Sequence, residues 1–279
     1  MRPPTQFAVL TIALFILGCR YGSRNEDPVA GMGLTETVLG RALVEKSVSL
    51  ANSWLERGIG IHFMPSWKTP SGTDARDAVP VYAISELHAP ANYMVAVPAR
   101  CHCVFVQPRV YETWLRDHLS HSGLTLEVLE ERLLAFMLIH EAGHIAYGDP
   151  GQFDSSNSGS LNTDATAEKQ REESADAFAV EQLRGALTRT KDTDAWLNAL
   201  NATKDLANLS FEMQQVRSEQ CFGSESLHTP AAFYDVGYTH PNFELRVLTV
   251  NNLISNTETS RQLLANFQAG RAPQSSVLF

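Results

Sequence analysis

The stretch TLEVLEERLLAFMLIHEAGHIAYG, residues 125–148, decides how the rest of this 279-residue chain is interpreted. Thr125 is a suitable N-cap, and Gly148 followed by Pro150 is typical of a helix end. The second half of the stretch is apolar on nearly every side. An amphipathic surface helix would keep one polar face, so this sequence predicts a central, buried helix.

The second half of this predicted helix carries the pattern His-Glu-x-x-His, formed by His140, Glu141 and His144. Residues four apart share one helix face, so the two imidazoles can bind a single zinc ion with Glu141 beside it as a general base. The neighbouring residues are apolar, and burying two unpartnered histidines among them would be costly. The sequence therefore predicts one zinc ion, held by His140 and His144.

A third protein ligand is needed, because a catalytic zinc usually keeps three and leaves one position open. The Gly and third His of the metzincin pattern do not follow His144. Glu172 lies 28 residues later, on a helix predicted over 167–184, and is the preferred ligand. Asp176, one turn further, is expected to hold the free N–H of a zinc-bound histidine, His140 in particular. The alternative ligands on the same helix are Glu173 and then Glu168.

The remaining chain alternates short β-rich runs with helical periodicity, which predicts an α+β fold that is mostly helical with a small antiparallel sheet. A turn at 98–100 joins two of the runs and predicts a hairpin. The expected strands are 59–64, 81–84, 92–97 and 101–106. The expected further helices are 35–57, 110–119, one or two within 192–219, and 241–268 with a break.

The first eighteen residues resemble a secretion signal. Residues 7–17 are almost all apolar, but such a run is too short to cross a bilayer as a helix. The run ends Ile16-Leu17-Gly18-Cys19, which resembles a bacterial lipobox. We therefore predict a signal peptide over 1–18, a lipid-modified Cys19, a polar tether over 19–34 and one metallopeptidase domain over 35–279. The alternative is an ordinary signal peptide in which Cys19 is incidental.

Three cysteines remain after Cys19: Cys101, Cys103 and Cys221. In an oxidising compartment they allow one disulfide, between Cys221 and either Cys101 or Cys103. Cys101-His102-Cys103 could instead bind a metal. We favour a strand on which both cysteines point to one face, because a chelating cluster would need further ligands nearby.

The charge balance excludes one class of partner. Lys and Arg number 22 against 31 Asp and Glu, and no basic run stands out. Phosphate backbones are bound through clustered positive charge, so no nucleic acid is expected as a partner.

The chain resembles the HtpX and CAAX prenyl protease (Ste-type) family of gluzincin zinc metallopeptidases. The resemblance rests on residues 140–149 and 172–176, on His240-Pro241 followed by Arg246, and more loosely on 91–96 with 104–106. It spans roughly residues 80–250 and implies a zincin-like domain, in which a small sheet with a substrate-binding edge strand lies over two active-site helices. The chain lacks the transmembrane helices of HtpX-type members and is closer to soluble lipoprotein members, some of which act in envelope protein quality control.

Besides the metal ligands, the expected site residues are catalytic residues and a strand that binds the substrate. Glu141 is the general base, and His240 or Arg246 could donate to the oxyanion; by resemblance His240 could also approach the metal as a gate. The opposing interpretation is that His240 caps a helix and Arg246 makes a structural ion pair. The substrate is expected to add as a strand along Asn92, Tyr93, Met94, Val95 and Ala96.

The function expected is a lipid-anchored zinc metalloendopeptidase of the bacterial envelope. It would face the periplasm, and Arg20 after Cys19 favours the outer membrane. Its substrates would be unfolded or extended polypeptides. The alternative is a non-proteolytic or latent zinc-containing lipoprotein that binds polypeptides as a chaperone does; an intact Glu141 argues against it, because a purely structural site needs no general base.

Overall fold

The computed structural model describes residues 27–68, 77–85, 93–99, 101–119, 126–149, 151, 165–222 and 243–268. Their elements, in chain order, are α1 (Pro28–Gly31), α2 (Arg41–Trp54), the 3-10 turn η1 (Arg57–Ile59), β1 (His62–Pro65), β2 (Ala78–Ala83), β3 (Val95–Ala96), β4 (Val104–Val106), α3 (Pro108–Leu119), α4 (Leu126–Tyr147), α5 (Ala165–Arg189), α6 (Thr193–Phe222), α7 (Phe243–Ser255) and α8 (Glu258–Gln268). The described chain is mostly helical with one small sheet, which agrees with the α+β prediction.

The sheet has the strand order β1-β2-β4-β3 and is mixed. The predicted hairpin is confirmed, since β3 and β4 pair antiparallel with Val95 opposite Val106. The expectation of an antiparallel sheet was wrong, because β1–β2 and β2–β4 are parallel pairs. A tight turn dictates direction only for the hairpin that it closes. A longer connection separates β1 from β2, and β4 follows the hairpin turn, which brings the chain back to run parallel to β2.

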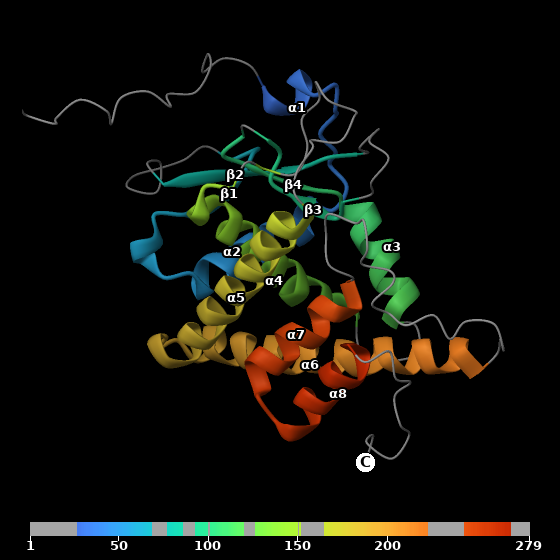
Figure 1. Cartoon of the computed structure of the whole chain (residues 1–279). Helices are drawn as coiled ribbons and strands as arrows, with labels where there is room; N and C mark the ends of the chain where they lie inside the picture. The colour runs from blue at the N-terminus through green and yellow to red at the C-terminus, as the bar shows by residue number, and fades with distance from the viewer. Residues whose placement is uncertain are drawn as a thin grey trace, which may run out of the picture.

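The sheet is covered on both faces (Figure 1). Val79, Val81 and Ala83 alternate along β2 with half-buried residues, and they join the main core formed with α2 and α4. The opposite face carries Phe105, which packs with Val29 of α1 in a separate cluster. The sheet therefore has the larger helical layer on one side only, and the candidate site lies on that side.

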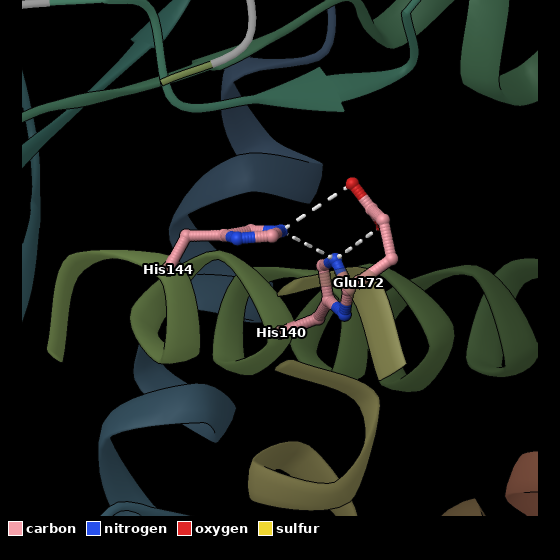
Figure 2. A group of neighbouring side chains, drawn as sticks. All are labelled: His140, His144 and Glu172. Carbon is pink, nitrogen blue, oxygen red and sulfur yellow. Dashed lines mark hydrogen bonds and ion pairs between the residues drawn. The ribbon is translucent and has the colours of Figure 1, made fainter. Parts of the chain in front are cut away.

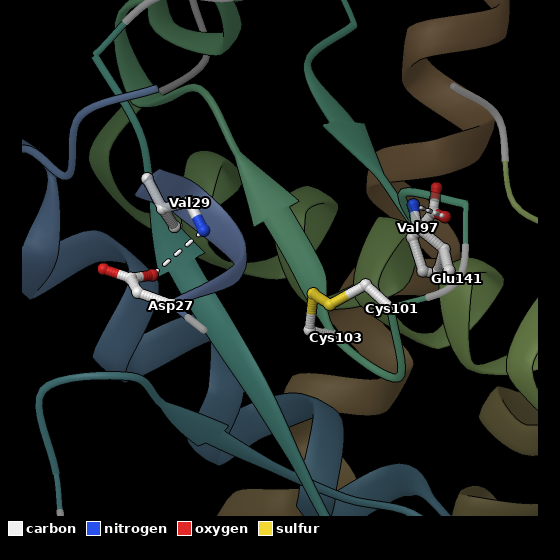
Figure 3. The surroundings of a disulfide bond; sticks show 6 residues. All are labelled: Asp27, Val29, Val97, Cys101, Cys103 and Glu141. Atoms are coloured by element: carbon white, nitrogen blue, oxygen red, sulfur yellow. Dashed lines mark hydrogen bonds between the residues drawn. A yellow bond between two sulfur atoms is a disulfide. The ribbon is translucent and has the colours of Figure 1, made fainter. Parts of the chain in front are cut away.

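The predicted tether is shorter than expected. Val29 is buried, and α1 begins with the side chain of Asp27 accepting a hydrogen bond from the Val29 N–H at 2.9 Å (Figure 3). Thr35 O accepts from Ser85 N at 2.9 Å, next to the sheet. Residues 27–34 therefore belong to the folded domain. The predicted signal peptide and Cys19 lie outside the described residues.

The cysteine prediction was also wrong. Cys101 and Cys103 form a disulfide with each other, beside the turn between β3 and β4 (Figure 3). The chain bends at 101–103 and the strand begins only at Val104. The bend brings the two Cα atoms to 5.1 Å, which suits a disulfide better than the roughly 6.6 Å between alternate residues of an extended strand. Both thiols are used in this bond, so they do not form the alternative metal site.

Two glycines shape the central helix. Gly148 has φ +71°, a left-handed conformation that ends α4 where the sequence predicts. A Cβ atom on Gly143 would lie 3.0 Å from the Cα atom of Ala175 in α5. Gly143 therefore lets α4 and α5 approach closely, which brings the side chains at 172 and 176 to the histidines of α4.

No helix among the described residues is both long and apolar enough to span a bilayer.

Candidate metal centre

The centre lies where α4 and α5 pass one another, on the side of α4 that faces the sheet. Figure 2 shows the imidazoles of His140 and His144 projecting from adjacent turns of α4 toward the carboxylate of Glu172 on α5. All three side chains are buried, and Glu172 is only 1% exposed. They are a group of buried residues that could hold a metal ion, with their ligand atoms within 4.8 Å of one another.

The spacing of the three side chains suits a small cation. The Nε2 atoms of His140 and His144 are 3.0 Å apart. Glu172 places Oε2 at 3.2 Å from the first and Oε1 at 3.6 Å from the second. Ligand atoms about 2.0–2.1 Å from a tetrahedral metal lie about 3.3 Å from one another. The observed separations bracket that value, so the side chains are already arranged for one ion.

The outer nitrogens of both histidines contact carboxylates. Nδ1 of His140 lies 2.9 Å from Oδ1 of Asp176, as the sequence predicted. Nδ1 of His144 lies 2.8 Å from Oδ2 of Asp149, a partner that the sequence analysis did not assign. A carboxylate only accepts hydrogen bonds, so each Nδ1 carries a proton, and it is Nε2 of each ring that faces the centre.

This pattern of protons tests whether the residues fit a metal. Two imidazole Nε2 atoms and one carboxylate converge among buried side chains, where polar groups need a partner. A divalent cation satisfies all three donors at once, and the carboxylate–histidine contacts outside it are those that usually orient metal ligands. The residues present therefore fit a metal.

Arg246 of α7 supplies the positive charge that borders the centre. Its Nη2 and Nε atoms donate to Asp176 at 2.9 and 3.1 Å, and Nη1 lies 3.0 Å from Oε2 of Glu172. Nη2 is also 3.1 Å from Nε2 of His140. Since Arg246 is bound by two carboxylates, its contacts favour the structural ion pair over the oxyanion donor.

The charges around the centre raise the pKa of His140 and lower the pKa of Asp176. Burial and Arg246 lower the pKa of His140, but the carboxylates of Asp176 and Glu172 outweigh them and raise that pKa to about 9. Burial raises the pKa of Asp176, and Arg246 and His140 overcome this effect and lower it to about 2. Asp176 is therefore ionised at neutral pH and accepts hydrogen bonds from both His140 and Arg246. A metal ion at the centre would displace the second proton that a pKa of about 9 gives His140.

Glu141 connects the centre to the sheet. It is 3% exposed, and its Oε2 atom accepts a hydrogen bond of 3.0 Å from the backbone N–H of Val97, directly after β3 (Figure 3). Burial raises the pKa of its carboxyl group, and the histidines and Arg246 partly oppose that shift. A carboxylate with a raised pKa is a better proton acceptor, which is the property that a general base needs.

The predicted edge strand lies beside this carboxylate. β3 is at the edge of the sheet, although it covers only Val95 and Ala96 of the predicted run. Tyr93 and Met94 precede it, and Gln107 holds both: its Nε2 donates to the Tyr93 carbonyl at 2.6 Å and its backbone N–H donates to the Met94 carbonyl at 2.9 Å. Gln107 is buried, and no sequence pattern marked it.

The remaining candidates are placed as follows. Glu173 is exposed, and Glu168 makes an ion pair with Arg171 at 2.7 Å, so neither replaces Glu172 among the converging side chains. His240 and Asn92 lie outside the described residues. Asp149 could have been found from its position just after the left-handed Gly148, because the reversal of the chain there turns the next side chain back toward His144.

Searches against protein-family models, curated proteins and solved structures found no match to the chain.

Proposed function

We propose that the protein is a zinc metalloendopeptidase with a zincin-like domain, of the HtpX and CAAX prenyl protease type. The observation that carries the proposal is the convergence of His140, His144 and Glu172, with the buried carboxylate of Glu141 between them and an edge strand. A metal site that only binds or stabilises has no need of a further protonatable carboxylate, such as that of Glu141, beside the ligand cluster.

Zinc is the metal that the donor set favours. Two imidazoles and one carboxylate are the ligands of the thermolysin type of catalytic zinc site, which leaves the fourth position for water. Softer metals select thiolates, and hard cations such as Mg²⁺ and Ca²⁺ prefer oxygen-only sites. The only two cysteine side chains that the structure describes are joined to each other in a disulfide, so neither is a free thiolate that could compete as a ligand.

The chemistry divides between the ion and the chain. Bound zinc would acidify a water molecule and polarise the scissile carbonyl. Glu141 accepts the proton of the attacking water and later delivers it to the leaving amine. Asp176 and Asp149 hold the two imidazoles in orientation from behind, and Arg246 holds the carboxylates of Asp176 and Glu172 in place. The Val97 N–H fixes the direction of the Glu141 carboxylate.

The substrate class follows from the edge strand. β3 has β4 on one side and is the last strand of the described sheet on the other, so an extended peptide can add there through its backbone. Backbone pairing requires a segment without its own secondary structure. We therefore infer that unfolded or extended polypeptides are the substrates, which suits a role in protein quality control.

The cellular location depends on the N-terminus. The lipobox-like Ile16-Leu17-Gly18-Cys19 supports a protein anchored in the bacterial envelope by lipid on Cys19, facing the periplasm and favouring the outer membrane. Mass spectrometry of the N-terminal peptide after expression with its own leader tests this part. A diacylglyceryl group on Cys19 is the expected result, and an unmodified Cys19 would leave a secreted enzyme.

Proteolysis is tested with purified, zinc-loaded protein and its Glu141→Gln variant on reduced, unfolded casein. The variant keeps the shape and the Val97 contact but removes the proton acceptor, so cleavage should fall by at least about 100-fold while zinc content stays the same. Cleavage by neither protein, with equal zinc content and casein binding, would instead support the non-proteolytic, chaperone-like alternative.

A further inference from the structure

A cavity of about 240 Å³ opens beside the metal centre. His140, Glu141 and Glu172 form its polar end, together with Asp176 and Arg246. The cavity is therefore continuous with the place where the proposed reaction occurs. A group that fills it would lie next to the bond that is broken.

The rest of the cavity has a different character. Four helices each contribute at least one large apolar side chain to its walls: Trp114 of α3, Leu133 of α4, Leu206 of α6 and Val250 of α7. Tyr111 also lines it, but its hydroxyl already donates to the carbonyl of Glu130 at 2.7 Å. Away from the polar end, every described lining residue is apolar or aromatic. The walls there carry no charged side chain, so a charged group would lose hydration without gaining an opposite charge.

The size of the cavity limits what it can hold. A cavity of about 150 Å³ binds benzene, which corresponds to about 25 Å³ for each carbon. On that scale 240 Å³ holds about nine or ten carbons, enough for one Phe, Leu, Met or Trp side chain. A farnesyl chain of fifteen carbons would need about 375 Å³ and does not fit.

The edge strand explains how a side chain would reach it. Met94 and Val95 line the cavity, and Val95 belongs to the core on the helical face of the sheet. Successive side chains of a strand point to opposite faces, so a peptide paired with β3 directs every second side chain toward the helical face. One of these side chains would lie above the cavity, beside Glu141.

We propose that this cavity is the specificity pocket of the enzyme and takes one large apolar side chain of the substrate, from a residue next to the scissile bond. This inference rests on the proposed peptidase function and adds its preference. It gives the enzyme a way to recognise unfolded chains, because large apolar side chains are buried in folded proteins and accessible in unfolded ones.

Cleavage sites in reduced casein are mapped by mass spectrometry, and the best site is then made as a peptide series with Phe, Leu, Ala or Glu at the selected position. We expect kcat/KM to be about 100-fold higher for Phe than for Ala, with Glu lowest. Val250→Trp replaces a three-carbon side chain with one of ten heavy atoms, which on the same scale occupies more than half of the cavity, and should reduce the Phe-to-Ala ratio to below about tenfold. Leu253→Trp, on an exposed part of the same helix, is the matched control and should keep the ratio.

The affinity for amino-acid hydroxamates tests the specificity pocket separately from the peptidase activity. Phenylalanine hydroxamate should bind the zinc-loaded protein at least about tenfold more tightly than alanine hydroxamate, and Val250→Trp should remove the difference. Leu206→Phe, a milder change, serves if Val250→Trp does not fold, and should shift the preference from Phe toward Leu. Two results would refute the specificity pocket but leave the peptidase proposal intact. One is cleavage with no preference for a large apolar side chain, and the other is a higher kcat/KM for a farnesylated peptide than for the Phe peptide. If no peptide is cleaved but phenylalanine hydroxamate still binds more tightly than alanine hydroxamate, the peptidase proposal is refuted and the apolar pocket is kept.

Discussion

Replacing Asp176 with asparagine removes one negative charge from a side chain that makes three close contacts. Its oxygens lie 2.9 Å from Nδ1 of His140 and 2.9 and 3.1 Å from Nη2 and Nε of Arg246. Asparagine has the same shape, but its amide group must turn an N–H toward either His140 or Arg246, both of which are donors. The variant therefore loses the orientation of a metal ligand and half of the charge that binds Arg246.

The magnitude follows from the pKa of Asp176, which falls from 3.8 to about 2 in the folded chain. A shift of that size corresponds to about 2 kcal/mol of folding free energy at neutral pH. Because the folded pKa is depressed, this stabilisation is complete above pH 3.8 and is lost as the pH falls toward 2. The Asp176→Asn variant should be less stable by at least this amount at pH 7, and the difference should shrink below pH 4.

Zinc affinity gives the second readout. Losing a carboxylate that holds a ligating histidine usually costs 10–100-fold in affinity, so competition with a chromogenic chelator should show a loss of about 10–100-fold. The matched control is Asp205→Asn, which breaks the ion pair between Asp205 and Arg132, a pair that contains none of the three proposed ligands and neither of their carboxylate partners. Unchanged zinc affinity in Asp176→Asn, or an equal loss in Asp205→Asn, would refute the assigned role.

Three further predictions concern groups around the same centre. Asp149→Asn should lower zinc affinity by about 10–100-fold, because it releases Nδ1 of His144; no change in a chelator competition would contradict this. Gly143→Val should lower both the unfolding temperature and zinc affinity, since its side chain would meet Ala175 and Phe178, whereas Gly58→Ala, which has open space, should leave zinc affinity unchanged. Gln107→Ala should raise the KM for a peptide substrate with little change in zinc content, because it frees the carbonyl that precedes β3; an unchanged KM would show that this part of the strand does not bind substrate.

Helical spacing in the sequence predicted the part of the metal centre that lies on α4. His140, Glu141 and His144 follow one another on one helix, so spacing alone places them, and α4 runs over nearly the predicted residues. Glu172 and Asp176 were found through chemistry, because a ligand and its neighbour had to occur one turn apart on a second helix. Burial then separates Glu172 from the adjacent, exposed Glu173.

The parts that the sequence did not predict depend on contacts between distant segments. The relative direction of β1 and β2 is not set by a tight turn, because residues 66–77 lie between the two strands. The Cys101–Cys103 disulfide depends on a bend that replaces the expected strand. Arg246 was expected at the site only from the resemblance; its partners Asp176 and Glu172 lie 70 or more residues away, and no periodicity identifies them.

The central claim is that one zinc ion is held by His140, His144 and Glu172. Zinc K-edge X-ray absorption of the purified protein, combined with elemental analysis, tests it most directly. We predict one zinc for each chain, with two imidazole nitrogens at about 2.0–2.1 Å and oxygen ligands at about 2.0–2.2 Å, and loss of the metal in Glu172→Ala. Sulfur ligands, or zinc content unchanged in Glu172→Ala, would contradict the account.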